Sequence, residues 1–158
     1  MSQNTILLKA DALSNQNLRE ERVANAAITP GHFVELMSTN KVRVHATAGG
    51  AITPLIACED SYSGGTIDTA YAASGRVFLA WLREGDEVQA RLANGETAAI
   101  GSKLESYGDG TLRVVDTDTS AGTVKIGSII ATALEAVDMS SSSGADPAGL
   151  IRVKITRG

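Results

Sequence analysis

The sequence predicts a mostly β fold, a small barrel or sandwich of largely antiparallel strands with an extended N-terminal arm. Short apolar runs recur with turn signals about every ten residues, which is typical of all-β domains. Glycine supplies 16 of the 158 residues, which favours many tight turns, and no stretch carries a strong helix pattern. Hydrophobic residues make up 43% of the chain but aromatic residues only 4%, so aliphatic side chains must fill most of the core. The length indicates one domain, large enough to bury a core without disulfides.

We divide the chain into an N-terminal arm, residues 1–26, and a single β-rich domain, residues 27–158. The leader is polar and carries little core material apart from the triplet Ile6, Leu7 and Leu8. This triplet suits strand addition to the sheet edge of another protein. Pairing within its own domain is the alternative, because chain termini are often held by a sheet.

We expect residues 18–27 to be either an extended arm or a short helix. The charges of Arg19-Glu20-Glu21-Arg22 favour local pairing on a helix, but the apolar stripe is too narrow to stabilise one alone. The leader also supplies the candidate residues for contacts with a capsid or between subunits, which are Ile6, Leu7, Leu8, Leu18 and Val23.

The β-rich domain begins at Ile28–Leu36, where Pro30-Gly31 has the composition of a tight turn. Residues 33–37 and 41–46 have β character and flank Ser38-Thr39-Asn40, which predicts a hairpin.

The two histidines fall in different settings within this region. Arg43 and His45 alternate with apolar residues, the period of a half-buried strand, so we expect His45 to face solvent. His32 follows the predicted turn and is most simply a turn residue.

The second half of the chain contains the most apolar run, residues 77–82, which predicts a central strand buried on both faces. Trp81 lies in this run, where core packing is favoured over a role as an interface hot spot. Asn94-Gly95 and Asp109-Gly110 are strong hairpin signals, and residues 150–156 predict the last strand.

Composition argues against several classes of partner. The 14 basic and 18 acidic residues are mixed along the chain and give a net charge of −4, which disfavours direct nucleic-acid binding. The apolar runs are far shorter than the ~20 residues of a membrane span, so we expect no membrane partner. Cys58 is the single cysteine, so no intramolecular disulfide is possible, and its apolar neighbours predict a buried, inert thiol. These features indicate a soluble protein made in a reducing compartment.

No segment carries a catalytic, metal or cofactor signature. The histidines lack the spacing of metal ligands, and Glu59 and Asp60 are neighbours that would point to opposite faces of a strand. Residues 116–122 approach a calcium loop, but the glycine falls one position late and Gly127 occupies the position of the bidentate glutamate. We therefore expect a protein that is not an enzyme and uses no cofactor.

Three segments resemble a recurring pattern in head decoration, or cement, proteins of tailed bacteriophages. They are Val23–Leu36 (VANAAITPGHFVEL), Arg83–Leu92 (REGDEVQARL), and Ile126-Gly127-Ser128 leading into Leu134-Glu135-Ala136-Val137. The likeness runs in order through residues 18–138. It implies a β-tulip-like barrel that commonly forms a homotrimer, with a dimer as the alternative. The implied partner is the major capsid protein, and the implied location is the capsid surface of the virion after assembly in the host cytoplasm. The implied function is to cement adjacent capsid subunits against the pressure of packed DNA.

Two other functions remain open. A ligand-binding β module, for instance one that binds a cell-surface glycan, would present exposed aromatic side chains, and the candidates are Tyr62, Tyr71 and Tyr107. A small hydrolase or isomerase would need acids, histidines and nucleophiles that gather in space although they are scattered in sequence.

Overall fold

Short strands form nearly all of the regular structure in the computed structural model, which describes residues 5–115, 126–143 and 148–156. The predicted mostly β, barrel-type fold is confirmed. Helical structure in these ranges is limited to the 3-10 turns η1 (Asp11–Leu13), η2 (Gln16–Leu18) and η4 (Ile126–Ser128). The strands are β1 (Leu7–Lys9), β2 (Arg19–Ala24), β3 (Val34–Leu36), β4 (Lys41–Val44), β5 (Leu55–Ala57), β6 (Arg76–Trp81), β7 (Glu87–Leu92), β8 (Thr97–Ala98), β9 (Lys103–Ser106), β10 (Leu112–Val114), β11 (Ala131–Ala133), β12 (Val137–Asp138) and β13 (Gly149–Ile155).

The structure contains two barrels, each a ring of five strands. The first is called the larger barrel because its sheet includes a sixth strand, β1. The order β7-β10-β9-β11-β13 closes because β13 pairs with β7. This closing pair is the longest, with Gly149 opposite Leu92 at one end and Lys154 opposite Glu87 at the other. The pairing between β10 and β7 is a single parallel bridge, Leu112 to Leu92, and the other pairs of the ring are antiparallel.

The smaller barrel is a second ring, in the order β3-β4-β2-β6-β5. An antiparallel bridge between Phe33 and Ile56 joins β5 to the chain just before β3 and closes it. Hydrogen bonds from the Ala57 amide to the His32 carbonyl (3.0 Å) and from the Gly31 amide to the Ala57 carbonyl (2.8 Å) support the closure. Its core is aliphatic, as the composition predicts, and contains Ala24, Ile28, Val34, Val42, Leu55, Ala57, Val77 and Leu79.

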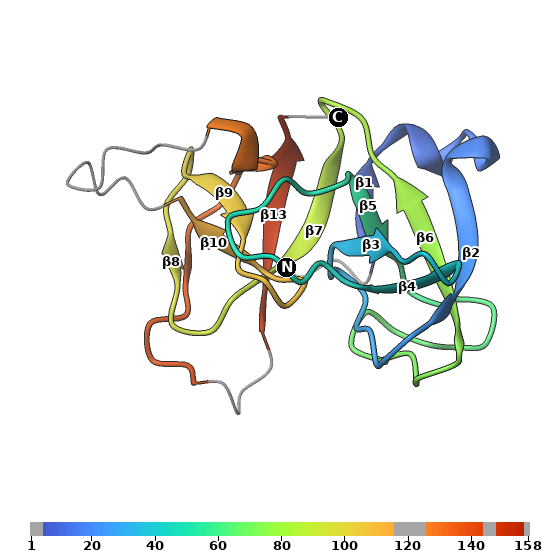
Figure 1. The fold of residues 1–158 in the computed structure, drawn as a ribbon. Coiled ribbons are helices and arrows are strands. Elements are labelled where there is room, and N and C mark those ends of the chain that lie inside the picture. The colour runs from blue at the N-terminus through green and yellow to red at the C-terminus, as the bar shows by residue number, and fades with distance from the viewer. Residues whose placement is uncertain (1–4, 116–125, 144–147, 157–158) are drawn as a thin grey trace.

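The two barrels lie side by side in Figure 1. Strands β5 and β6 belong to the smaller ring, but their side chains pack into both cores. Leu55 and Val77 belong to the core of the smaller barrel, whereas Ile56 and Ala80 belong to the larger cluster that includes the core of the other barrel. A strand that contacts two cores needs apolar side chains on both faces, which explains the unbroken apolar run of residues 77–82.

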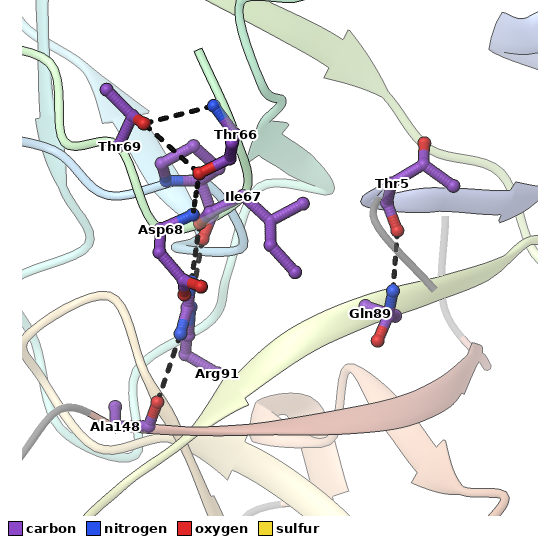
Figure 2. A network of polar contacts seen from close by, with 9 residues as sticks. Thr5, Thr66, Ile67, Asp68, Thr69, Gln89, Arg91 and Ala148 are labelled. Carbon is purple, nitrogen blue, oxygen red and sulfur yellow. Dashed lines mark hydrogen bonds and ion pairs between the residues drawn. The ribbon is translucent and has the colours of Figure 1, made fainter. Parts of the chain in front are cut away.

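The described part of the N-terminal segment belongs to the body, so the expected arm outside the fold is wrong for these residues. Strand β1 pairs with β7, and the Gln89 amide donates to the Ile6 carbonyl at 2.8 Å. The Gln89 side chain also donates to the Thr5 carbonyl at 2.7 Å (Figure 2). Ile6 is completely buried in the larger core cluster. The structure therefore agrees with the alternative, in which the triplet of residues 6–8 pairs within its own domain. Strands before residue 26 also share sheets with strands after it.

The helix considered for residues 18–27 is also wrong, because this segment contains strand β2, which lies between β4 and β6. Residues two apart lie on the same face of a strand, and Arg22 forms an ion pair with Glu20 on one face. On the opposite face, Glu21 pairs with Arg76 of β6 at 3.1 Å. Pairing with the strongly apolar β6 outweighs the weak helical preference of the segment.

Two of the three predicted hairpins are confirmed. Ser38-Thr39-Asn40 joins the paired strands β3 and β4, and Asp109-Gly110 joins the paired strands β9 and β10. Asn94-Gly95 forms a turn with positive φ at the glycine, but β7 and β8 pair with other strands. The last predicted strand, residues 150–156, corresponds to β13 (Gly149–Ile155).

Candidate functional site

A buried arginine connects the two barrels. The side chain of Arg91, on β7, is 5% exposed. Its guanidinium donates to the carbonyl oxygens of Pro30 (3.0 Å), Ile67 (2.5 Å) and Ala148 (3.2 Å), and to the Asp68 carboxylate (2.9 Å). Figure 2 shows Ile67, Asp68 and Ala148, from two distant segments of the chain, around this one side chain. Arginine suits this position because its fork presents five N–H donors in fixed directions.

The loop that receives Arg91 is held by its own hydrogen bonds. The Thr66 amide donates to Thr69 Oγ1 at 3.0 Å (Figure 2). The Thr69 amide also donates to the Thr66 carbonyl at 3.0 Å. This loop connects β5 to β6 of the smaller barrel, whereas Ala148 leads into β13 of the larger one. Arg91 therefore fixes how the barrels sit against each other.

A groove of about 700 Å³ opens between the N-terminal segment and the smaller barrel. The N-terminal segment contributes one wall, the loop after β5 contributes another, and the sheet of β2 and β6 contributes the rest. The lining residues are Thr5, Leu7, Leu13, Gln16, Arg19, Glu20, Glu21, Cys58, Glu59, Ser61, Tyr62, Phe78 and Leu79. The lining thus combines apolar and aromatic side chains with hydrogen-bonding groups, as ligand sites usually do.

Tyr62 is the most exposed large apolar side chain of the described residues, at 86%. Its ring contacts Phe78, with centroids 5.8 Å apart and planes tilted by 41°. Asp60 orders the loop that carries it, since the carboxylate accepts from the amides of Tyr62 and Ser63, both at 3.1 Å. The Asp60 carbonyl also accepts from the Gly65 amide at 2.8 Å. An ordered loop therefore presents this aromatic ring to solvent.

Two charged side chains of the groove, Glu59 and Arg19, have no partner of opposite charge within ion-pair distance in the described ranges. Glu59 accepts from Thr5 Oγ1 (2.7 Å) and the Ile6 amide (3.0 Å), both neutral donors. Arg19 donates through Nε to the Ala12 carbonyl at 2.7 Å. The other donors of Arg19 and the remaining lone pairs of Glu59 can therefore serve a ligand.

A serine, a histidine and a glutamate come together elsewhere, in an arrangement that resembles hydrolase chemistry. His45 Nδ1 lies 2.8 Å from Ser106 Oγ, and His45 Nε2 lies 3.8 Å from a Glu35 carboxylate oxygen and 3.2 Å from the Ala51 carbonyl. Ser106 is 0% exposed and also accepts from the Gly108 amide at 3.1 Å. A substrate cannot reach such a hydroxyl, so this network favours a structural role, which orders the turn after β9.

The position of His45 corrects the expectation that it faces solvent, because it is 3% exposed. It lies just beyond β4, where the larger barrel covers the face that a half-buried strand would leave open. Trp81, by contrast, packs against the smaller core as favoured, and its indole donates to Glu20 at 2.9 Å.

The remaining chemical candidates within the described ranges are scattered or buried. Burial raises the pKa of the Cys58 thiol to about 12, and the Glu59 carboxylate acts in the same direction. The described residues contain no group of three or more His, Cys, Asp or Glu side chains able to hold a metal ion. The calcium-like residues 116–122 lie outside the described ranges. Among the residues described, no helix is long and apolar enough to cross a membrane.

The five predicted contact residues are not equally accessible. Ile6 and Leu7 are buried, at 0% and 5% exposure, and pack in the larger core cluster. Leu8 and Leu18 are half-buried, and Val23 is 41% exposed. Val23 is therefore the member of the set best placed to contact another molecule, and its role stays a prediction.

The three candidate tyrosines differ in exposure and in their position relative to the groove. Tyr71 is engaged in the fold, because its hydroxyl donates to the Cys58 carbonyl at 2.6 Å and its ring packs against the smaller core. Tyr107 is 44% exposed but does not line the groove. Only Tyr62 combines high exposure with a place in the groove. Sequence patterns did not predict this groove, because its lining comes from separate parts of the chain.

Comparison with known proteins finds a similarity of fold. No protein-family model matches the chain. No curated protein matches it by sequence. The fold is similar to the N base of head fiber gp8.5 of bacteriophage phi29, with a TM-score of 0.54. The match covers 89% of this chain and 94% of the other at 10% sequence identity. The two proteins therefore share a fold that extends over nearly the whole of each.

Proposed function

We propose that this chain is a structural virion protein of a tailed bacteriophage, which binds the outside of the head and cements adjacent major capsid subunits. The observation that carries the proposal is the similarity of fold to the base of a phage head fiber over 89% of this chain and 94% of that one. The sequence resemblance to head decoration proteins supports the same class of function independently of the fold.

The architecture suits a protein that acts by binding rather than by catalysis. Two closed barrels are joined by a continuous apolar cluster and a buried arginine, which gives a stiff body able to hold a fixed spacing between neighbouring shell subunits. The buried Ser106 hydroxyl argues against the hydrolase alternative. The major capsid protein is the proposed partner, and a homotrimer is the proposed assembly, with a dimer as the alternative. Cofactors, nucleic acid and membranes have no part in this function.

Val23 marks a surface that could contact the shell. It lines a shallow hollow of about 360 Å³ together with Glu21, Arg22, Asn40 and Arg76. An exposed apolar side chain within a charged rim has the composition of a small protein-contact site. Neither barrel needs the Val23 side chain for its core, so its substitution should leave folding intact.

The test combines the purified full-length protein with emptied shells of the parent virus. We expect saturation at a fixed ratio of protein to capsid subunits in co-sedimentation, and a higher temperature of shell disruption. Val23→Ser should weaken binding about fivefold while the melting temperature of the free protein stays the same. Light scattering after size exclusion measures the oligomeric state.

Ile100→Ser is the matched control, because Ile100 is 73% exposed and does not line the hollow. It should bind shells as the unmodified protein does. Failure of the unmodified protein to bind shells, or its absence from purified virions, would show that the proposed function is wrong.

A further inference from the structure

The groove beside β2 is not needed to explain the proposed cementing function, and its lining combines an exposed aromatic ring with hydrogen-bonding side chains. Tyr62 is 86% exposed, so its aromatic ring is available to a ligand in the groove. Its loop is fixed by three hydrogen bonds to Asp60. The ring is therefore presented in a defined place before any ligand arrives, which lowers the entropic cost of binding.

The groove lining offers two kinds of chemistry. Tyr62, Phe78 and Leu13 supply apolar surface, and Leu13 is itself 50% exposed. The polar side chains of the lining are Thr5, Gln16, Arg19, Glu20, Glu21, Glu59 and Ser61. Arginine only donates hydrogen bonds, an ionised glutamate only accepts them, and glutamine does both.

A ligand that matches this lining needs an apolar face together with many groups that both donate and accept. A sugar ring has both features, because one face presents C–H groups and the hydroxyls project around its edge. The C–H groups are slightly positive and complement the negative face of an aromatic ring. Each hydroxyl can accept from Arg19 and donate to a carboxylate such as Glu59, neither of which has an opposite charge within ion-pair distance in the part of the chain described.

A polypeptide segment fits the groove less well. The buried centre of a protein interface is depleted in charged residues, whereas this lining contains Arg19 and three glutamates. Burying these charges against an apolar peptide would carry a desolvation cost that sugar hydroxyls offset by hydrogen bonding.

We propose that the groove binds a short oligosaccharide, with Tyr62 stacked against one sugar ring and the groups of Gln16, Arg19, Glu21 and Glu59 bonded to its hydroxyls. The volume of about 700 Å³ lies within the range of small-molecule sites. This site is separate from the Val23 hollow except for Glu21, which lines both. The proposal does not depend on attachment to a capsid.

The test uses the full-length protein coupled to fluorescent beads, because multivalent display makes weak carbohydrate binding detectable. The beads are applied to a printed array of bacterial surface oligosaccharides, and the strongest hit is then titrated free in solution by calorimetry. We expect Tyr62→Ser to lower the affinity at least about tenfold and Tyr62→Trp to retain it. Tyr107→Ser is the control and should bind as the unmodified protein does.

Each result decides for or against the site. Glycan binding that requires Tyr62 but not Tyr107 supports it. An array without signal overturns the proposal, and so does glycan binding that is unchanged in Tyr62→Ser. Loss of shell attachment in Tyr62→Ser without any glycan binding would identify the groove as a protein-docking site instead and would also overturn it. The melting temperature of each variant shows that it is folded, which is expected because the Tyr62 side chain is outside the core.

Discussion

Gly110 lies where the tip of the β9–β10 hairpin meets the smaller barrel. Its carbonyl accepts from the Phe33 amide at 2.9 Å, and its φ is +85°. A Cβ at this position would lie 2.9 Å from the Val44 Cβ and 3.0 Å from the His32 Cβ. We therefore expect Gly110→Ala to lower the free energy of unfolding by about 2–4 kcal/mol, through both φ strain and the steric conflict.

Gly101→Ala separates these two causes. Gly101 has a similar φ of +88°, but nothing lies within 4 Å of the position its Cβ would take. This variant should lose only the ~1–2 kcal/mol of backbone strain. Urea unfolding of both proteins measures the difference, and equal losses would contradict a steric role for the contact with the smaller barrel.

His32 gives stability a dependence on pH. Burial lowers its pKa from 6.5 to about 4, the Asp109 carboxylate opposes this shift, and the Arg91 guanidinium adds to it. Between these two pH values the unfolded chain binds a proton that the folded chain does not. Stability should therefore fall as the pH drops from about 6.5 to about 4, by up to about 3 kcal/mol from this group.

The measurement compares urea midpoints at several pH values for the unmodified protein and His32→Gln. Acidic groups such as Glu87, whose pKa is lowered mainly by its bond to Arg152, contribute to the acid dependence of both proteins. Only the difference between the two slopes reports His32. We expect a shallower decline in His32→Gln between pH 6.5 and pH 4, and parallel curves would exclude the contribution.

Strand β1 is the element for which the structure changes the prediction most. An arm outside the fold could be removed without effect on melting, but Ile6 is 0% exposed and Leu7 is 5% exposed. Ile6→Ala should therefore lower the free energy of unfolding by about 2–4 kcal/mol. Leu8→Ala, at a half-buried position on the same strand, should cost about 1 kcal/mol or less. A similar small loss for both, measured by urea unfolding, would mean that β1 detaches from β7 in solution.

The elements that the sequence predicts correctly are those determined locally. The apolar run of residues 77–82 and the turn chemistry of Asp109-Gly110 need no knowledge of distant residues. Strand β2 was missed because its apolar content is low and its neighbour β6 supplies most of the packing. A signal was present, since Glu20 and Arg22 are two residues apart, the spacing of a strand rather than of a helix.

The groove depends on contacts between segments far apart in sequence, which limits its prediction. Tyr62 could be named as a possible ligand-binding aromatic from its loop, but its place in one groove with Gln16 and Arg19 follows from the path of the N-terminal segment. Once that segment was interpreted as an arm, its residues could not be placed in a wall of the body. The role of Arg91 was also hidden, because an arginine in a strand normally faces solvent.

At the scale of the whole molecule, the two barrels should unfold as one unit. A continuous cluster of buried residues includes Ile56 and Ala80 from the smaller barrel together with Leu92 and Ile151 from the larger one. Trp81 is the single tryptophan and lies on β6, so its fluorescence reports the smaller barrel, whereas circular dichroism reports all strands. We expect these two signals to follow the same urea transition in the unmodified protein.

Arg91 provides the polar part of this coupling. Lysine keeps the charge but concentrates its donors at one nitrogen, so it cannot reach the carbonyls of Pro30, Ile67 and Ala148 together. Arg91→Lys should therefore lower the free energy of unfolding by about 2–3 kcal/mol, because buried carbonyls lose their partners. Arg43→Lys, at an arginine whose side chain is 49% exposed, should stay within about 0.5 kcal/mol of the unmodified protein.

The same urea experiment distinguishes coupling between the barrels from local stabilisation. If Arg91 holds the barrels together, the transition in Arg91→Lys should broaden, and the Trp81 signal should separate from the circular dichroism signal. The separation is expected because Pro30 and Ile67, which belong to loops of the smaller barrel, lose their bonds to β7 while the strands within each ring keep theirs. A sharp transition shared by both signals and shifted to lower urea would mean that the apolar cluster alone couples the barrels, with Arg91 contributing only to total stability.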